Sequence, residues 1–325
     1  MKGKSLFIAC LLFCSLSVFG QRMTDRLDRG LVAVQTEGGV YCSWRVLAEE
    51  YYDVTYNLYR DGMKVNQEPL KVSNFVDAAG TAASKYTVTA IGLRNRESDP
   101  CKEVAVWNQH WLEITPDHGD LKSTYVPNDA CMADVDGDGK LEILMKFDNQ
   151  SEIQASYPKE GYYGEYSIVE VFKLDGTKLW WLDFGPNMGD FQNNEQNIIA
   201  YDWDQDGRAE AVMRAADGTT IHMADGTTYV VGDATKNYRS ATGGGTNWFM
   251  HDGAEYLVYM NGETGVPYQV MDYPLKRLET GETDLNAAWG DGYGHRSSKH
   301  FFGAPCLDGA RRASSSPEAS IPVIR

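Results

Sequence analysis

The sequence has no excess of positive charge. Lys and Arg total 30 against 46 Asp and Glu, which gives a formal net charge of −16 at pH 7. Proteins that bind nucleic acid neutralise phosphates with clustered Lys and Arg, so we do not expect a nucleic-acid partner. The acidic surplus has two readings: it keeps the protein soluble, or part of it serves as ligands for a cation.

Long hydrophobic runs are also lacking, except for one at the amino terminus. Two lysines precede an uncharged run over residues 5–19, and small residues follow up to Gly20. The run is short for a membrane span and typical of a cleaved secretory signal. We therefore expect residues 1–20 to be a signal peptide and the protein to be secreted, periplasmic or at the cell surface. Lipid attachment through Cys10 or Cys14 is the weaker alternative.

Cysteine is scarce, with six residues in the chain, two of them in the expected signal peptide. The remaining four are Cys42, Cys101, Cys131 and Cys306. Export permits disulfides, but the wide spacing predicts neither a disulfide framework nor a zinc site. We expect these residues to be buried free thiols.

Runs of helix-forming residues are few, whereas turn and strand formers are common. The chain has 32 Gly, 19 Tyr and 8 Trp, with 42% hydrophobic residues, which excludes a disordered chain. This balance predicts short strands joined by turns and therefore an all-β fold. A length of 325 residues allows about one to three domains.

Residues 21–110 read as a first, small β domain. Strand-like runs occur at residues 31–34, 40–44, 56–59 and 86–91. Asp61-Gly62 follows the third run and is a strong hairpin-turn signal. Strands at this spacing with an internal Trp favour a β-sandwich of the fibronectin type III or immunoglobulin kind. Such modules support a neighbouring domain, so we assign this one no chemistry.

Residues 111–309 contain an internal repeat. The segment DVDGDGKLE at 134–142 recurs as DWDQDGRAE at 202–210, and a strand-like run follows each copy. Hairpin signals, Asp-Gly at 175–176 and Asn-Gly at 261–262, come next. Successive blades of a β-propeller would give this order. Roughly two to three units are present, fewer than the four or more of a closed ring, so we predict part of a calcium-binding β-propeller.

The two Asp-rich loops match the ligand pattern of calcium. Calcium takes oxygen ligands at loop positions 1, 3 and 5, a carbonyl at 7 and a further carboxylate, with Gly at 6 for the turn. The predicted ligands are Asp134, Asp136, Asp138, Glu142 and the Lys140 carbonyl in the first loop, and Asp202, Asp204, Asp206, Glu210 and the Arg208 carbonyl in the second. The alternative is an Asp/Gly turn that only starts a strand. Two copies at one blade position favour calcium in a structural role.

Several ordered motifs resemble rhamnogalacturonan lyases of polysaccharide lyase family 11. They are LDRGLVAV at 27–34, SWR at 43–45, NLYRDG at 57–62, NDA at 128–130, ADGT at 216–219, WGD at 289–291 and GHR at 294–296. The likeness runs from about residue 24 to residue 309. It implies a fibronectin-like domain followed by an eight-bladed, calcium-loaded propeller.

The resemblance also implies an activity, β-elimination in the rhamnose–galacturonate backbone of pectin. A cation or positive side chain neutralises the galacturonate carboxylate, and a Lys or Arg then removes the adjacent proton while the 4-linked sugar departs. The family's Lys and Arg for this step are expected in a carboxy-terminal half that this chain does not match. Its catalytic residues therefore stay unassigned.

Two groups of residues match sugar-binding positions by the same resemblance. Asn128 and Asp148 match positions that contact sugar in the family's cleft; the alternatives are a loop-capping Asn and a strand-end Asp. His295, Arg296 and Lys299 form a polar cluster that either binds an anionic sugar or lies at a turn.

The end of the chain departs from the family. Residues 310–325 show neither strand alternation nor a helical period, and we expect an unstructured tail. One explanation is a disordered linker; the other is a shift of reading frame, which would leave a truncated and inactive enzyme.

Three functions remain open from the sequence. The first is a monomeric, calcium-dependent lyase acting on rhamnogalacturonan I. The second is a non-catalytic propeller that binds a polysaccharide with the help of calcium. The third is a hydrolase of the same polysaccharide, which would produce reducing ends without an unsaturated uronate.

Overall fold

The computed structural model describes residues 27–48, 50, 53–116, 125–149, 166–188, 198–238, 253–278, 281–290, 295–298 and 302–304. Strands dominate these residues, and the helical elements among them are short: η1 (Leu93–Asn95), α2 (Leu285–Trp289) and α3 (His295–Ser298). The predicted all-β fold is confirmed. In this part of the chain, no helix is long and apolar enough to cross a membrane. The expected signal peptide and tail fall outside the described residues.

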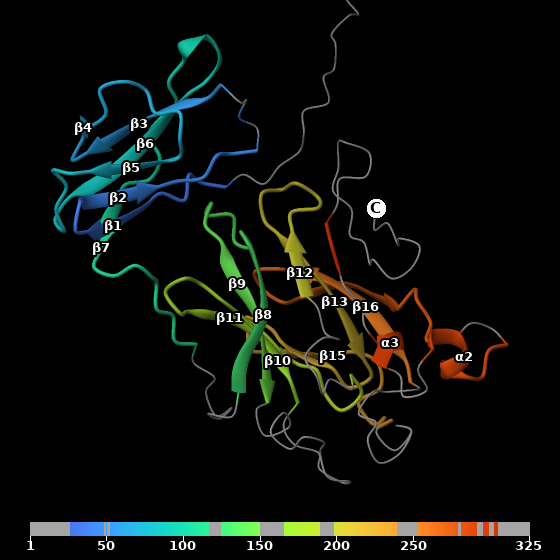
Figure 1. Ribbon diagram of the computed structural model, residues 1–325. Coiled ribbons are helices and arrows are strands. Elements are labelled where there is room, and N and C mark those ends of the chain that lie inside the picture. The colour runs from blue at the N-terminus through green and yellow to red at the C-terminus, as the bar shows by residue number, and fades with distance from the viewer. Residues whose placement is uncertain are drawn as a thin grey trace, which may run out of the picture.

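Seven strands form the first sheet, in the order β4-β3-β6-β7-β1-β2-β5 (Figure 1). They are β1 (Val32–Thr36), β2 (Gly39–Ser43), β3 (Thr55–Arg60), β4 (Met63–Lys64), β5 (Asn74–Asp77), β6 (Lys85–Ile91) and β7 (Val104–Trp107). Strand β7 pairs antiparallel with β6 and parallel with β1, and so joins two groups of strands. The β3–β4 hairpin turns at Asp61 and Gly62, which both have positive φ as the turn signal predicted.

One hydrophobic cluster fills this first β domain. The buried members include Ala33, Val40 and Cys42 from β1 and β2, and Leu58, Tyr86 and Val88 from β3 and β6. Trp44 packs edge-to-face on Tyr56, with 5.4 Å between the ring centroids. Because both groups of strands bury their side chains in the same cluster, the sheet folds around a single core.

The second sheet has six antiparallel strands, in the order β15-β14-β11-β10-β9-β8. They are β8 (Tyr125–Ala133), β9 (Glu142–Asn149), β10 (Ile168–Phe172), β11 (Lys178–Asp183), β14 (Thr220–His222) and β15 (Thr228–Val230). The β10–β11 connection contains the predicted Asp-Gly hairpin turn. The short β14–β15 hairpin extends the sheet beyond the four strands of a propeller blade, a feature that the sequence repeat did not indicate.

The third sheet has four antiparallel strands, in the order β12-β13-β16-β17. They are β12 (Ile198–Tyr201), β13 (Glu210–Ala216), β16 (Glu255–Asn261) and β17 (Pro267–Asp272). The predicted Asn-Gly pair lies where β16 ends, since Asn261 is the last residue of β16 and Gly262 begins the connection to β17. The two strands that follow the Asp-rich loops are β9 and β13, and each is second from an edge of its sheet.

The second and third sheets share one core. It includes Leu144, Val169 and Leu182 from the second sheet and Ala211, Met213 and Val258 from the third. A buried hydrogen bond also joins the two sheets, because Trp180 Nε1 donates to the carbonyl of Gly262 at 2.7 Å. Val212 lies in a different cluster, with Leu257 and Tyr273. Successive side chains of a strand point to opposite faces of the sheet, so strand β13 is buried on both faces.

The described cysteines are free thiols. Cys42 is buried, whereas Cys101 and Cys131 are partly buried. Burial raises the pKa of Cys131 to about 12, which keeps the thiol protonated. Cys306 lies outside the described residues.

Candidate functional site

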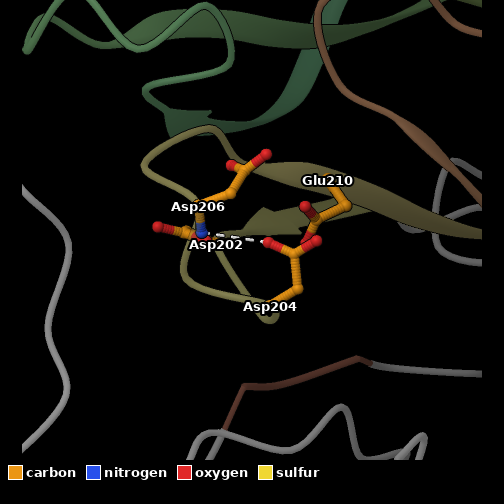
Figure 2. A group of neighbouring side chains, drawn as sticks. All are labelled: Asp202, Asp204, Asp206 and Glu210. Carbon is orange, nitrogen blue, oxygen red and sulfur yellow. Dashed lines mark hydrogen bonds between the residues drawn. The ribbon is translucent and has the colours of Figure 1, made fainter.

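The second Asp-rich loop, between β12 and β13, gathers four carboxylates. One oxygen from each of Asp202, Asp204, Asp206 and Glu210 lies within 4.8 Å of the others (Figure 2). Backbone donors hold the loop in this shape: Asp204 Oδ1 accepts from the Asp206 N–H at 3.0 Å, and Asp202 Oδ2 from the Gly207 N–H at 2.9 Å. All of these predicted carboxylate ligands therefore converge.

One oxygen of this group indicates that a cation fits here. Within the described part of the chain, Asp202 Oδ1 is buried and accepts no hydrogen bond, which is costly for a carboxylate oxygen. Burial, followed by the charges of Asp204 and Asp202, raises the pKa of Glu210 to about 7. A divalent cation would satisfy the buried oxygen and offset the repulsion. An all-oxygen ligand set suits calcium or magnesium rather than zinc.

The first loop, between β8 and β9, gathers three carboxylates, those of Asp134, Asp136 and Asp138. Glu142 is not in that group, although the sequence pattern predicts it as a ligand. Its Oε2 accepts the Val135 N–H at 2.9 Å, and burial raises its pKa to about 7. Glu210 of the second loop accepts the Trp203 N–H in the same way, at 3.0 Å, so this hydrogen bond is common to both loops and does not by itself exclude Glu142 as a ligand.

Two lysines contact the first loop. Lys140 Nζ lies 3.1 Å from Asp138 Oδ2, and Lys173 Nζ, from the β10–β11 hairpin, forms an ion pair with Asp136. Both oxygens of Asp134 are also used, because they accept the N–H groups of Gly137 and Gly139 at 2.8 Å. The first loop thus satisfies much of its negative charge with protein groups.

The first loop also touches the first β domain. The Asp28 N–H donates to the carbonyl of Gly139 at 2.9 Å. Gly139 has φ +84°, and a Cβ there would lie 3.2 Å from Asp28 atoms. Glycine at this loop position therefore serves both the turn and the close approach of the neighbouring domain.

Asn128 and Asp148 are brought together at a β-bulge. In the register of β8 and β9, Pro127 pairs with Phe147 and Ala130 with Met145. Two residues of β8 therefore oppose one residue of β9. Asn128 Nδ2 donates to Asp148 Oδ2 across this bulge. The sequence predicted both residues as sugar contacts, and the structure shows them as a hydrogen-bonded pair.

A buried lysine, which the sequence analysis did not select, completes this cluster. Lys146 is 2% exposed, and its Nζ lies 3.2 Å from Asp148 Oδ1. The equivalent residue of the second repeat is Arg214, which is fully buried and pairs with Glu255. The sequence did hold a signal for this lysine, because both repeated strands carry a basic residue at the same position.

The polar cluster predicted around His295 is only partly described. Arg296 is exposed, and its Nη1 donates to the carbonyl of Trp289 at 3.0 Å, which joins α3 to α2. The side chain of His295 and the whole of Lys299 lie outside the described residues. A role for these three residues in binding an anionic sugar stays a prediction.

Comparison with known proteins places this chain in a family. Residues 112–315 match the C-terminal domain of rhamnogalacturonan lyase family 11, and residues 22–107 match the β-sheet domain of rhamnogalacturonan I lyases. The chain belongs to rhamnogalacturonan lyase family 11, as the motif resemblance indicated.

Two relatives from Bacillus subtilis support this membership. The chain is 37% identical over 297 residues to the rhamnogalacturonan endolyase YesW, which covers 89% of this chain and 45% of that protein. It is 37% identical over 303 residues to the rhamnogalacturonan exolyase YesX, which covers 90% of this chain and 46% of that protein. The chain thus spans a little under half the length of these relatives.

Solved structures show the same fold. The crystal structure of YesX aligns with a TM-score of 0.73 at 35% identity and covers 91% of this chain and 47% of that chain. A rhamnogalacturonan lyase from Bacillus licheniformis aligns with a TM-score of 0.72 at 34% identity and covers 91% of this chain and 49% of that one.

Proposed function

We propose that this chain acts in a calcium-dependent rhamnogalacturonan lyase that cleaves the rhamnose–galacturonate backbone of pectin by β-elimination. The observation that carries the proposal is its 37% identity, over nine tenths of the chain, to an endolyase and an exolyase of rhamnogalacturonan. Because both relatives are equally similar, the proposal does not choose between internal and terminal cleavage.

In this proposal, residues of this chain bind calcium and bind the saccharide. The Asp-rich loops hold calcium, which supplies positive charge at the corners between β8 and β9 and between β12 and β13. Asn128 and Asp148 belong to the saccharide-binding surface, and the cluster of His295, Arg296 and Lys299 remains a candidate for binding an anionic sugar. The base that removes the proton next to the galacturonate carboxylate stays unassigned.

The proposal includes a domain arrangement. Residues 21–110 form a fibronectin type III-like sandwich, supported by two groups of strands around one core. Residues 111–309 form part of a β-propeller, supported by two consecutive packed sheets that each carry an Asp-rich loop at the same place. We also propose that residues 1–20 direct secretion and that the protein works as a monomer.

The test is incubation of the calcium-loaded protein with rhamnogalacturonan I. A lyase produces a 4,5-unsaturated uronate, which absorbs ultraviolet light, and the rise in absorbance should stop with a chelator and resume with calcium. New reducing ends without that absorbance would indicate a hydrolase and contradict the proposal.

Binding without cleavage is the second candidate function. It is favoured by the presence of the Asn128–Asp148 pair in a chain whose base is unassigned. Calorimetry with rhamnogalacturonan oligosaccharides distinguishes the two, because a calcium-dependent binder gives heat of binding and no unsaturated product.

A further inference from the structure

We propose that the two Asp-rich loops are coupled, so that an ion in the second loop strengthens calcium binding at the first. Two peptide units and two buried hydrogen bonds form a relay between the loops. The relay runs from the Arg208 carbonyl, a predicted ligand of the second loop, to Glu142, the predicted closing ligand of the first. The inference rests on the calcium binding in the proposed function and not on the lyase activity.

The first hydrogen bond of the relay joins the two loops directly. The Ala209 N–H donates to the carbonyl of Asp134 at 2.7 Å. This N–H and the Arg208 carbonyl belong to one planar peptide unit, and in a trans peptide the two groups point in opposite directions. A cation at the Arg208 carbonyl therefore lies on one side of this unit, and Asp134 of the first loop lies on the other.

The second hydrogen bond continues into the first loop. The carbonyl of Asp134 shares a peptide unit with the Val135 N–H, which donates to Glu142 Oε2 at 2.9 Å. At the second loop, the Trp203 N–H donates in the same way to Glu210, which is one of the four converging carboxylates. The relay thus ends in the hydrogen bond that orients the equivalent ligand of the second loop.

Burial lets the two hydrogen bonds influence each other. Asp134, Val135, Glu142 and Ala209 are between 1% and 8% exposed, and hydrogen bonds in such low-dielectric surroundings polarise one another. A cation at the Arg208 carbonyl draws electron density toward that oxygen, which makes the Ala209 N–H a stronger donor. The Asp134 carbonyl is polarised in turn, and the Val135 N–H becomes a stronger donor to Glu142. A filled second loop therefore orients the closing ligand of the first.

Close packing ties the shapes of the two loops together. Gly137 of the first loop has φ +78°, and a Cβ there would lie 3.2 Å from both Arg208 Cγ and the Gly207 carbonyl oxygen. On the other side, a Cβ on Gly262 would lie 2.1 Å from the Ala209 carbonyl oxygen. The second loop is thus packed between the first loop and the start of the β16–β17 connection, so a change in its shape reaches the first loop.

The sign of the coupling separates the relay from simple charge. Two divalent ions in neighbouring loops repel each other, so charge alone makes each ion weaken the binding of the other. Water screens this repulsion at exposed groups, whereas the relay is buried. We therefore expect positive cooperativity, with the second loop filled before the first.

The experiment titrates the wild type, Asp206→Ala, Asp138→Ala and Ala209→Pro with calcium by calorimetry. Asp206 and Asp138 occupy the same position of the two loops and are both exposed, so each substitution weakens one ion site with little effect on folding. Asp206→Ala should lower the affinity of the first loop about fivefold. Asp138→Ala should lower that of the second loop by the same factor, because coupling is reciprocal.

Ala209→Pro tests the relay itself, because it removes the donor N–H and keeps every ligand and charge. In this background, Asp206→Ala should no longer change the calcium affinity of the first loop. Amide NMR follows the relay without a proline. When calcium fills the second loop of Asp138→Ala, the amide protons of Ala209 and Val135 should shift downfield. The Gly139 amide lies in the first loop outside the relay and should shift much less.

Two results would overturn the inference and leave the proposed function standing. One is calcium binding at both loops with a coupling that Ala209→Pro does not change. The other, which also decides the case where the proline variant does not fold, is a Val135 amide that shifts no more than that of Gly139. If the wild type binds no calcium, the coupling and the proposed calcium dependence both fail. Coupled calcium binding without an unsaturated product would contradict only the proposed lyase.

Discussion

The two Asp-rich loops share one sequence pattern but differ in how the protein treats their charge. In the first loop, Lys140 and Lys173 contact Asp138 and Asp136. In the second loop, the corresponding basic residue, Arg208, instead pairs with Glu263. The first loop therefore carries its own counter-charges, whereas the second is left with a tighter group of carboxylates.

Part of the difference arises outside the repeated segment. Lys173 belongs to the β10–β11 hairpin. At the second loop the described structure instead places Tyr259 of β16 beside Glu210; burial raises the pKa of that carboxyl, and the hydrogen bond from Tyr259 offsets part of the rise. Ligand charge and preorganisation set calcium affinity in such loops. We therefore expect the second loop to bind calcium more tightly than the first.

The largest expected effect is the loss of calcium affinity when the first carboxylate of the second loop is removed. Asp202→Ala should weaken calcium binding at the second loop by roughly a hundredfold or more, because it deletes a buried charged ligand. Asp134→Ala should have a smaller effect on total calcium affinity, since the first loop binds weakly from the start. Calorimetric titration of both variants with calcium measures the two losses of affinity. Equal losses would contradict the proposed difference between the two loops.

An intermediate effect on calcium affinity is expected from replacing the lysine that forms an ion pair with the first loop. Lys173→Met should strengthen calcium binding at the first loop about tenfold, because a competing cation is removed from Asp136. The matched control is Arg208→Met, which breaks the ion pair with Glu263 but keeps the backbone carbonyl that is predicted as a ligand, and it should leave calcium binding nearly unchanged. Weaker binding by Lys173→Met would show that the lysine supports the site instead of competing with calcium.

The smallest expected effect is a pH dependence of thermal stability. Burial raises the pKa of Glu142 and of Glu210 from 4.5 to about 7. Between pH 4.5 and about 7, the folded ion-free protein holds protons that the unfolded chain has released, so stability falls as pH rises through this window. Thermal melts in chelator should show this decrease, and saturating calcium should remove it. A melting temperature that rises with pH in chelator would contradict the assignment.

The sequence predicted the fold where local signals were strong. The Asp61-Gly62 turn, the two repeated loops and the strands that follow them all lie where their patterns indicated, because each depends on neighbouring residues. Sheet membership was harder to predict. The β14–β15 hairpin joins the second sheet although it follows a strand of the third, and only tertiary pairing determines that.

The candidate site shows the same limit. The carboxylate spacing predicted the second loop, but it could not show that Glu142 lies outside the first group of carboxylates or that Lys173 reaches the first loop from another hairpin. Lys146 was missed because a lysine in a strand is usually exposed. Its position in the repeat, shared with Arg214, carries that information only when the two copies are compared.

Calcium titration of the chelated protein tests the central claim most directly. We expect calorimetry to show binding at two sites, with the second loop filled first, together with a rise in melting temperature. Anomalous scattering from crystals grown at limiting calcium should then place an ion among Asp202, Asp204, Asp206 and Glu210. No heat of binding and an unchanged melting temperature would contradict the account.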